Sequence, residues 1–102
     1  MNMSDLMKQA QQFQEKLAAV QNDLGNQQVV GSAGAGMITV TMNGKGELLG
    51  LVIEQALVQP DNTQMLQDLF VAAVNDGIAK AKELGKSEMT RLTGGLNIPG
   101  LV

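Results

Sequence analysis

The N-terminal segment carries a narrow apolar seam. Its apolar residues recur at alternating intervals of three and four, at Met3, Leu6, Ala10, Phe13, Leu17, Val20 and Leu24. This 3.5-residue period is typical of coiled coils and predicts a helix of roughly twenty residues. Ser4 is its expected N-cap, and Gly25 with Asn26 ends it. Because the flanks are polar, we expect another apolar surface, from this chain or a second copy, to cover the seam.

The pattern of residues 37–53 predicts two strands joined by a tight turn. Residues 37–42 place Met and Thr on one side and Ile, Val and Met on the other, as in a half-buried strand. Residues 43–46 form the expected hairpin turn. Residues 48–53 then form a strand that is apolar on both faces. One covering layer requires only one apolar face, so this pattern favours contact of the second face with another chain.

Small residues separate the first helix from these strands. Residues 27–30 predict a short strand, and residues 31–36, which are all Gly, Ser or Ala, suit a turn or a closely approached edge strand. A phosphate-binding loop is the weaker interpretation, since the segment precedes a strand and lacks the lysine and hydroxyl of a P-loop.

A second helix is expected from residue 60 onward, with Asp61 as N-cap and Gln64 completing a capping box. Its apolar stripe has a period near 3.6 and runs through Leu66, Phe70, Ala73, Gly77, Ala81 and Leu84. The stripe fades near Gly85, where we expect the helix to bend or break and to be solvated beyond. Residues 1–102 form one expected domain, in which residues 94–102 are a flexible tail.

Composition excludes most catalytic chemistry. The 102 residues include no His and no Cys, and the carboxylates form no close pair in the sequence. We therefore expect no enzyme, no metal site and no cofactor. A domain this small has limited core of its own, which favours a dimer. The candidate dimer-interface residues are Leu6, Ala10, Phe13, Leu17, Leu49, Leu51 and Ile53.

The charge of the chain is −3, but its cations are unevenly spread. Four of the seven lie between residues 80 and 91, beside Glu83 and Glu88. From composition alone, we interpret these four cations as the exposed end of a helix, where the helix dipole favours positive charge. This interpretation is preferred over a phosphate-binding patch. For Lys45, in the hairpin turn, solubility is similarly preferred over a phosphate contact.

Four segments together resemble the YbaB/EbfC family of small bacterial nucleoid-associated proteins. They are residues 6–17, 34–54, 65–76 and 89–101. The resemblance implies an α+β fold: a two-layer α-β-β-β-α protomer with a three-stranded antiparallel sheet. It also implies an intertwined homodimer whose projecting helices bind double-stranded DNA with little sequence preference.

The resemblance also gives candidate DNA contacts, namely Lys8, Gln12, Lys16, Lys80, Lys82, Lys86 and Arg91. It implies a cytoplasmic protein of the nucleoid. The amphipathic N-terminal segment predicts neither a signal peptide nor a membrane span. The alternative hypothesis is an adaptor that docks a replication or repair protein through its Met-rich and Leu-rich surfaces, with weak or no DNA binding.

Overall fold

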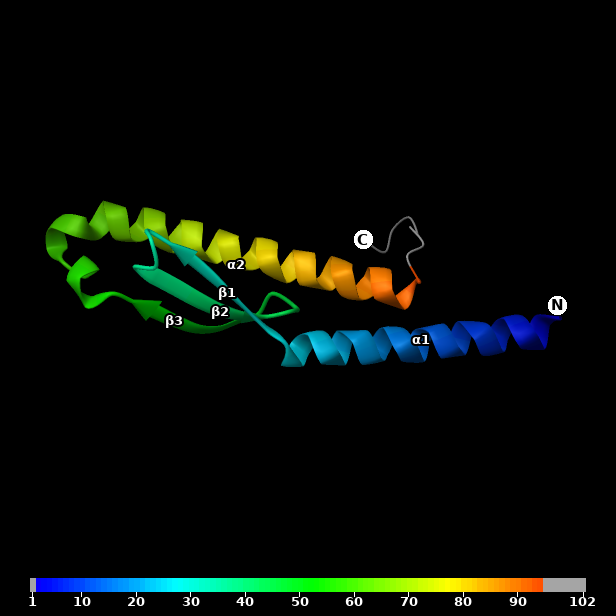
Figure 1. Cartoon of the computed structure of the whole chain (residues 1–102). Helices are drawn as coiled ribbons and strands as arrows, with labels where there is room; N and C mark the ends of the chain where they lie inside the picture. Colours follow the sequence, from blue (N-terminus) through cyan, green and yellow to red (C-terminus); the bar gives the residue numbers. More distant parts are fainter. Residues whose placement is uncertain (1, 95–102) are drawn as a thin grey trace.

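The computed structural model describes residues 2–94 and shows an α-β-β-β-α chain in two layers (Figure 1). A three-stranded sheet is covered on one face by the second long helix, and the first helix runs beside the far end of that helix. Its elements are α1 (Met3–Asn26), β1 (Gln28–Ala33), β2 (Ile38–Asn43), β3 (Leu48–Ile53), the 3-10 turns η1 (Gln55–Leu57) and η2 (Pro60–Asn62), and α2 (Thr63–Leu92). This confirms the expected α+β class. Beyond Gly94, the expected tail lies outside the described residues.

The sheet is antiparallel in the order β1-β2-β3, and its central strand carries the core. Ile38, Val40 and Met42 of β2 point toward α2 and are almost completely buried. Helix α2 packs mainly on β1 and β2. Strand β3 therefore lies at an edge that α2 covers least, with an irregularity in its pairing beside Met42.

Small residues let α2 lie unusually close to β1. A Cβ atom added to Gly31 would be 2.3 Å from the main-chain nitrogen of Gly77 and 2.5 Å from the carbonyl oxygen of Ala73. The two elements thus touch backbone to backbone. The expected stripe of α2 is confirmed where it matters most, since Ala73, Gly77 and Ala81 are buried. Of the two interpretations of residues 31–36, the edge strand is right as far as Ala33, and a turn follows it.

Both predicted helix starts are wrong in detail. Helix α1 begins at Met3, and the Asn2 side chain is its cap, because Asn2 Oδ1 accepts a 2.9 Å hydrogen bond from the Asp5 main-chain nitrogen. The expected capping box at Asp61 is absent from the structure: residues 60–62 form a 3-10 turn, and the Gln64 amide instead donates to Asp68 Oδ1 at 3.0 Å.

Helix α2 continues without a break through Gly85 to Leu92. The expected break is therefore absent. The end of the helix is solvated on one side only: Lys86, Ser87, Thr90 and Arg91 are exposed, whereas Met89 is only 8% exposed. The reason is tertiary: α1 runs alongside this part of α2 and buries it (Figure 1). The seam of α1 is covered unevenly in turn. Leu24 is buried and Phe13, Leu17 and Val20 are half-buried, whereas Met3, Leu6 and Ala10 are exposed.

Replacing Gly31 with Ala should lower the free energy of unfolding by about 2–3 kcal/mol or more, because the new methyl group meets main-chain atoms that have no rotamer to change. Denaturant unfolding at fixed protein concentration measures it.

Gly50→Ala is the matched control, since its nearest neighbour would be 4.0 Å away. That variant should keep its stability or gain up to about 1 kcal/mol. Equal stabilities for the two variants would contradict the close contact.

Candidate nucleic-acid interface

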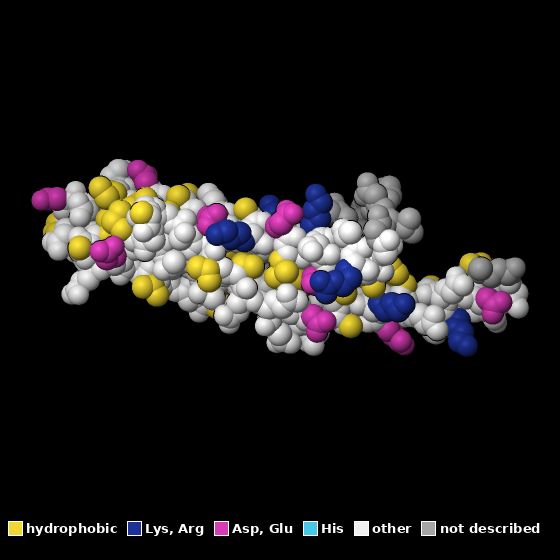
Figure 2. Space-filling model, in the orientation of Figure 1, with side chains coloured by type: hydrophobic (Ala, Val, Ile, Leu, Met, Phe, Trp, Pro, Cys, Tyr) yellow, Lys and Arg dark blue, Asp and Glu magenta, His cyan; other side chains and the backbone are white. Residues whose placement is uncertain are grey.

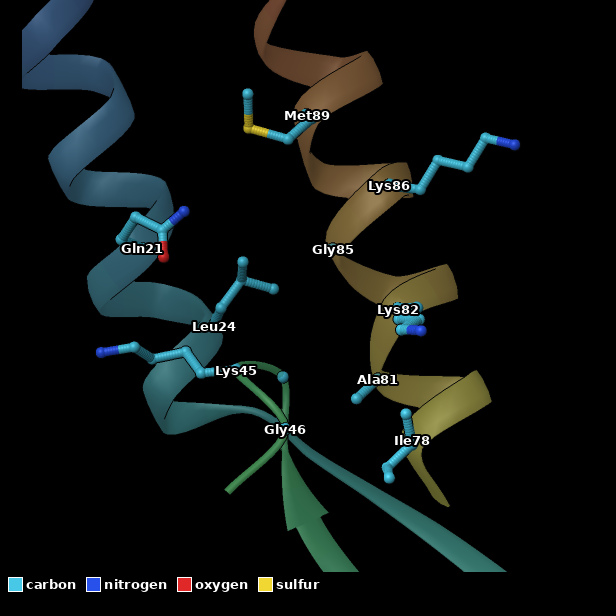
Figure 3. Close-up of a pocket in the computed structure, with 11 residues that line it drawn as sticks. Gln21, Leu24, Lys45, Gly46, Ile78, Ala81, Lys82, Gly85, Lys86 and Met89 are labelled. Carbon is cyan, nitrogen blue, oxygen red and sulfur yellow. The ribbon is translucent and has the colours of Figure 1, made fainter. Parts of the chain in front are cut away.

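A groove of about 760 Å³ opens where the end of α1, the turn between β2 and β3, and the second half of α2 meet (Figure 3). Its floor is apolar and consists of Leu24, Ile78, Ala81, Gly85 and Met89. Leu24 and Met89 point into the space between the two helices (Figure 3). The lining residues, all within the described part of the chain, include no acidic side chain.

Three lysines surround this groove: Lys45, Lys82 and Lys86, referred to below as the groove lysines. Lys45 comes from the hairpin turn and the other two from α2. In Figure 3, the Lys45 and Lys86 side chains extend outward on opposite sides of the groove. Within residues 2–94, none of the groove lysines has a carboxylate within ion-pair distance. Their charges are thus available to a ligand.

The turn that carries Lys45 is held by Asn43, which is 4% exposed. Asn43 Oδ1 accepts 3.0 Å hydrogen bonds from the main-chain nitrogens of Lys45 and Glu47, and its amide nitrogen donates to Glu47 Oε1 at 2.7 Å. The Gly44 nitrogen donates to the Leu24 carbonyl oxygen at 2.8 Å, which ties the turn to the end of α1. Lys45 therefore projects from a fixed main chain.

The four cations of α2 divide into two groups. A rotation of about 100° per residue places Lys82 and Lys86 within about 40° of each other, but Lys80 about 160° away from Lys82. Lys80 and Arg91 lie on the side away from the groove, and each has an acidic partner. Arg91 is 3.5 Å from Glu88, and Lys80 is 3.0 Å from Asp76.

Lys80 is also bound to the sheet. Its ammonium group donates to the Val30 carbonyl oxygen at 3.0 Å, while Asp76 Oδ2 accepts from the Ser32 main-chain nitrogen at 2.9 Å. That main-chain hydrogen bond, together with Lys80, lowers the pKa of the Asp76 carboxyl. Lys80 thus takes part in joining α2 to β1.

The α1 candidates lie on a different side. Lys8, Gln12 and Lys16 are all exposed and follow one another at helical intervals of four. Around α1, they lie about 160°, 120° and 80° from Leu24, which faces the groove. None of the three lines the groove beside the groove lysines. The assignment of all seven candidates to DNA stays a prediction.

Lys45 is the residue that sequence reasoning left out. The local sequence favours a hairpin turn in which Lys45 maintains solubility, and nothing in it shows that the turn packs beside α2. Figure 2 shows that the dark blue side chains extend from the middle of the molecule, where α2 still covers the sheet, to the end formed by α1. Acidic side chains are interspersed there, whereas the opposite end shows acidic ones alone on this face.

The fold is shared with a solved protein. The crystal structure of the uncharacterized protein HP0035 from Helicobacter pylori matches with a TM-score of 0.83, covering 92% of this chain and 99% of that chain at 24% identity. This likeness places the chain among small α+β proteins of one architecture.

Sequence comparison specifies the family. The pattern of the YbaB/EbfC DNA-binding family matches residues 1–96. Nucleoid-associated protein DP1429 of Desulfotalea psychrophila is 52% identical over 101 residues, which cover 99% of this chain and 95% of that protein. Nucleoid-associated protein GbCGDNIH1_0260 of Granulibacter bethesdensis is 50% identical over 98 residues, 96% of this chain and 92% of that protein. The chain belongs to the YbaB/EbfC DNA-binding family.

Two further features of residues 2–94 bear on other functions. No helix in this range is both long and apolar enough to span a bilayer. The range also holds no group of three or more acidic side chains placed to bind a metal ion.

The Asp76 carboxyl should make folding sensitive to acid. Its pKa is lowered in the folded chain, so its stabilising effect is complete above the ordinary value near 4 and is lost as the pH falls through the folded value. Between pH 6 and pH 2, the wild-type chain should lose more stability than Asp76→Asn, measured by denaturant unfolding at each pH.

Glu83→Gln is the control, because Glu83 has no ion pair within residues 2–94. It should follow the wild-type pH profile. Identical profiles for wild type and Asp76→Asn would contradict the role of this carboxylate.

Proposed function

We propose that this protein binds double-stranded DNA in the bacterial nucleoid as a homodimer, through phosphate contacts made by Lys45, Lys82 and Lys86. Membership of the DNA-binding family supports DNA as the ligand. One observation supports the site: three lysines without acidic partners surround a groove whose lining contains no carboxylate. The other α2 cations, Lys80 and Arg91, have carboxylate partners already.

This arrangement suits contacts with the DNA backbone. A lysine ammonium group is a compact charge that meets a phosphate from many directions, without the bidentate fork by which arginine recognises guanine. Phosphate contacts position a protein on the duplex but carry no sequence information. We therefore expect slight sequence preference and strong dependence on salt.

A homodimer would double this small set of cations. The chain also exposes apolar residues that a second copy can cover, including Leu6 and Ala10 on α1 and Leu49 and Leu51 on β3. The other interface candidates are less available: Phe13 and Leu17 are half-buried within the chain, and Ile53 packs against the core. We expect the interface to include the first group.

This function requires no chemical reaction. The chain contains neither His nor Cys, and its role is to hold DNA by charge. The adaptor hypothesis has one observation in its favour, the apolar floor of the groove, which would suit a segment of a protein partner. The two functions differ in their response to duplex DNA.

The DNA-binding surface can be tested by titrating unrelated fluorescent duplexes at several salt concentrations. If a dimer neutralises roughly four to six phosphates, the logarithm of affinity should fall with the logarithm of salt at a slope of about −4 to −5. Replacing all three groove lysines with Gln should weaken every duplex by at least about tenfold and flatten the slope by about 3 or more.

A triple variant with the same loss of charge is the control: Lys8→Gln, Lys16→Gln and Arg91→Gln. It should keep the slope within about one unit of wild type. Equal losses in both triple variants would show that net charge, and not this surface, determines affinity. Absence of binding by the wild-type chain at low salt would favour the adaptor.

A further inference from the structure

The groove between α1 and α2 has an apolar floor that phosphate contacts leave unexplained. Its lysines can meet the phosphates of a duplex, but the residues between them are mostly apolar. A phosphate backbone accounts for the lysines and leaves the floor uncovered. Exposed apolar surface with a polar border is typical of a site that binds another protein. The groove therefore fits a ligand that is both apolar and acidic.

Gly85 leaves open space in this floor. Beyond the adjoining turns of its own helix, nothing in residues 2–94 would lie within 4 Å of a Cβ atom added there. At Gly77 the same atom would lie 3.0 Å from Val40 Cγ2, so the packing of α2 on the sheet explains that glycine. The packing of residues 2–94 does not explain Gly85, although glycine weakens the interior of a helix. Its missing side chain lets a ligand approach the main chain of α2.

The shape of the groove suits a third helix. Helix α2 forms one side of it, and the end of α1 with the hairpin turn forms the other (Figure 3). The floor follows α2 from Ile78 to Met89, which at 1.5 Å per residue is about 16 Å, or three helical turns. A helix in such a groove buries apolar residues that recur every three or four positions. One large side chain of that helix can enter the space above Gly85.

The groove lysines border the floor on both sides. Lys45 extends on the side of α1 and the hairpin turn, and Lys86 on the side of α2 (Figure 3). The lining includes no carboxylate, and none of the groove lysines forms an ion pair within residues 2–94. A docked helix would therefore meet positive charge along both edges of its buried face. Acidic residues at these edges would be attracted, and basic residues repelled.

We propose that this groove docks a helical segment of another protein, whose apolar stripe is bordered by acidic residues on both sides, and that the docked segment excludes DNA. The docking surface rests on the groove itself, whereas the competition rests on the proposed function. Such a segment carries negative charge, as the DNA backbone does, and it also covers the apolar floor. A partner with this segment would release the protein from DNA by occupying the groove lysines.

A synthetic peptide serves as the probe. It has about 15 residues, with Leu at heptad positions a and d, Glu at positions e and g, and Ala elsewhere. Repulsion between the Glu side chains opposes pairing of the peptide with itself. Fluorescence anisotropy of the labelled peptide should show saturable binding at micromolar protein. A scrambled peptide, in which the same residues are ordered so that Leu is spread around the helix, should bind at least about tenfold more weakly.

Substitutions at Gly85 test the floor without changing the charge. Gly85→Ala and Gly85→Leu place their side chains in open space, so both variants should fold. The peptide should bind more weakly as the side chain grows, by about tenfold or more for Leu. Ser87→Leu is the matched control: Ser87 is exposed on another side of α2, and this variant should bind within about twofold of wild type. Equal affinity for the two peptides, or no loss in Gly85→Leu, would overturn the docking surface.

A labelled duplex separates the docking surface from the proposed function. Excess peptide should displace the duplex from the wild-type chain at low salt, at least about tenfold more effectively than the scrambled peptide. Binding of the peptide without binding of any duplex would overturn the DNA-binding function and leave the docking surface standing. Binding of duplexes but not of the peptide would overturn the docking surface alone. Simultaneous binding of both would overturn the competition.

Light scattering without peptide tests a second copy of the chain as the occupant. If the groove is free for another protein, Gly85→Leu should keep the molecular mass of the wild-type chain. A lower mass in this variant would show that a second copy covers the groove, and it would overturn the proposed partner.

Discussion

The main-chain contact between α2 and β1 determines much of this structure. Gly31 and Gly77 meet with no side chain between them, and the main chain of Ala73 also lies against Gly31. This brings α2 low over β2, where Ile38, Val40 and Met42 fill the core. It also brings Asp76 and Lys80 within reach of the β1 edge, and so combines packing with the hydrogen bonds that join α2 to β1.

The same contact directs the rest of α2 past the sheet. Its second half lies beside α1, and the turn after β2 packs against the end of α1, so Lys45 meets Lys82 and Lys86 around one groove. The cations of one helix thereby acquire different roles. Lys80 joins the helix to the sheet, Arg91 pairs with Glu88, and the groove lysines have no acidic partner within residues 2–94. In a chain of net charge −3, the distribution of the lysines between these roles matters more for binding DNA than the net charge.

Local patterns were enough to predict the class, the order of elements and the small-residue stripe of α2. Strand 48–53 was predicted with its observed bounds, because alternation and turn residues are local signals. The errors lie where distant segments decide. Met89 is buried because α1 folds beside it, and β1 extends through Ala33 because its pairing with β2 continues to Ile38. The candidate site shows the same difference between local and tertiary signals. Lys82 and Lys86 were candidates from the sequence, whereas Lys45 lies near them only in the folded chain.

The central claim is that the chain holds two kinds of lysine, one kind committed to the fold and one available to DNA. The most direct measurement is nuclear magnetic resonance of the lysine ammonium groups during titration with a short duplex. We expect the Nζ signals of Lys45, Lys82 and Lys86 to shift in step with binding, while Lys80 keeps the signal it has when bonded to Asp76 and Val30. Equal shifts at Lys80 and the groove lysines, or shifts confined to Lys8 and Lys16, would contradict the account.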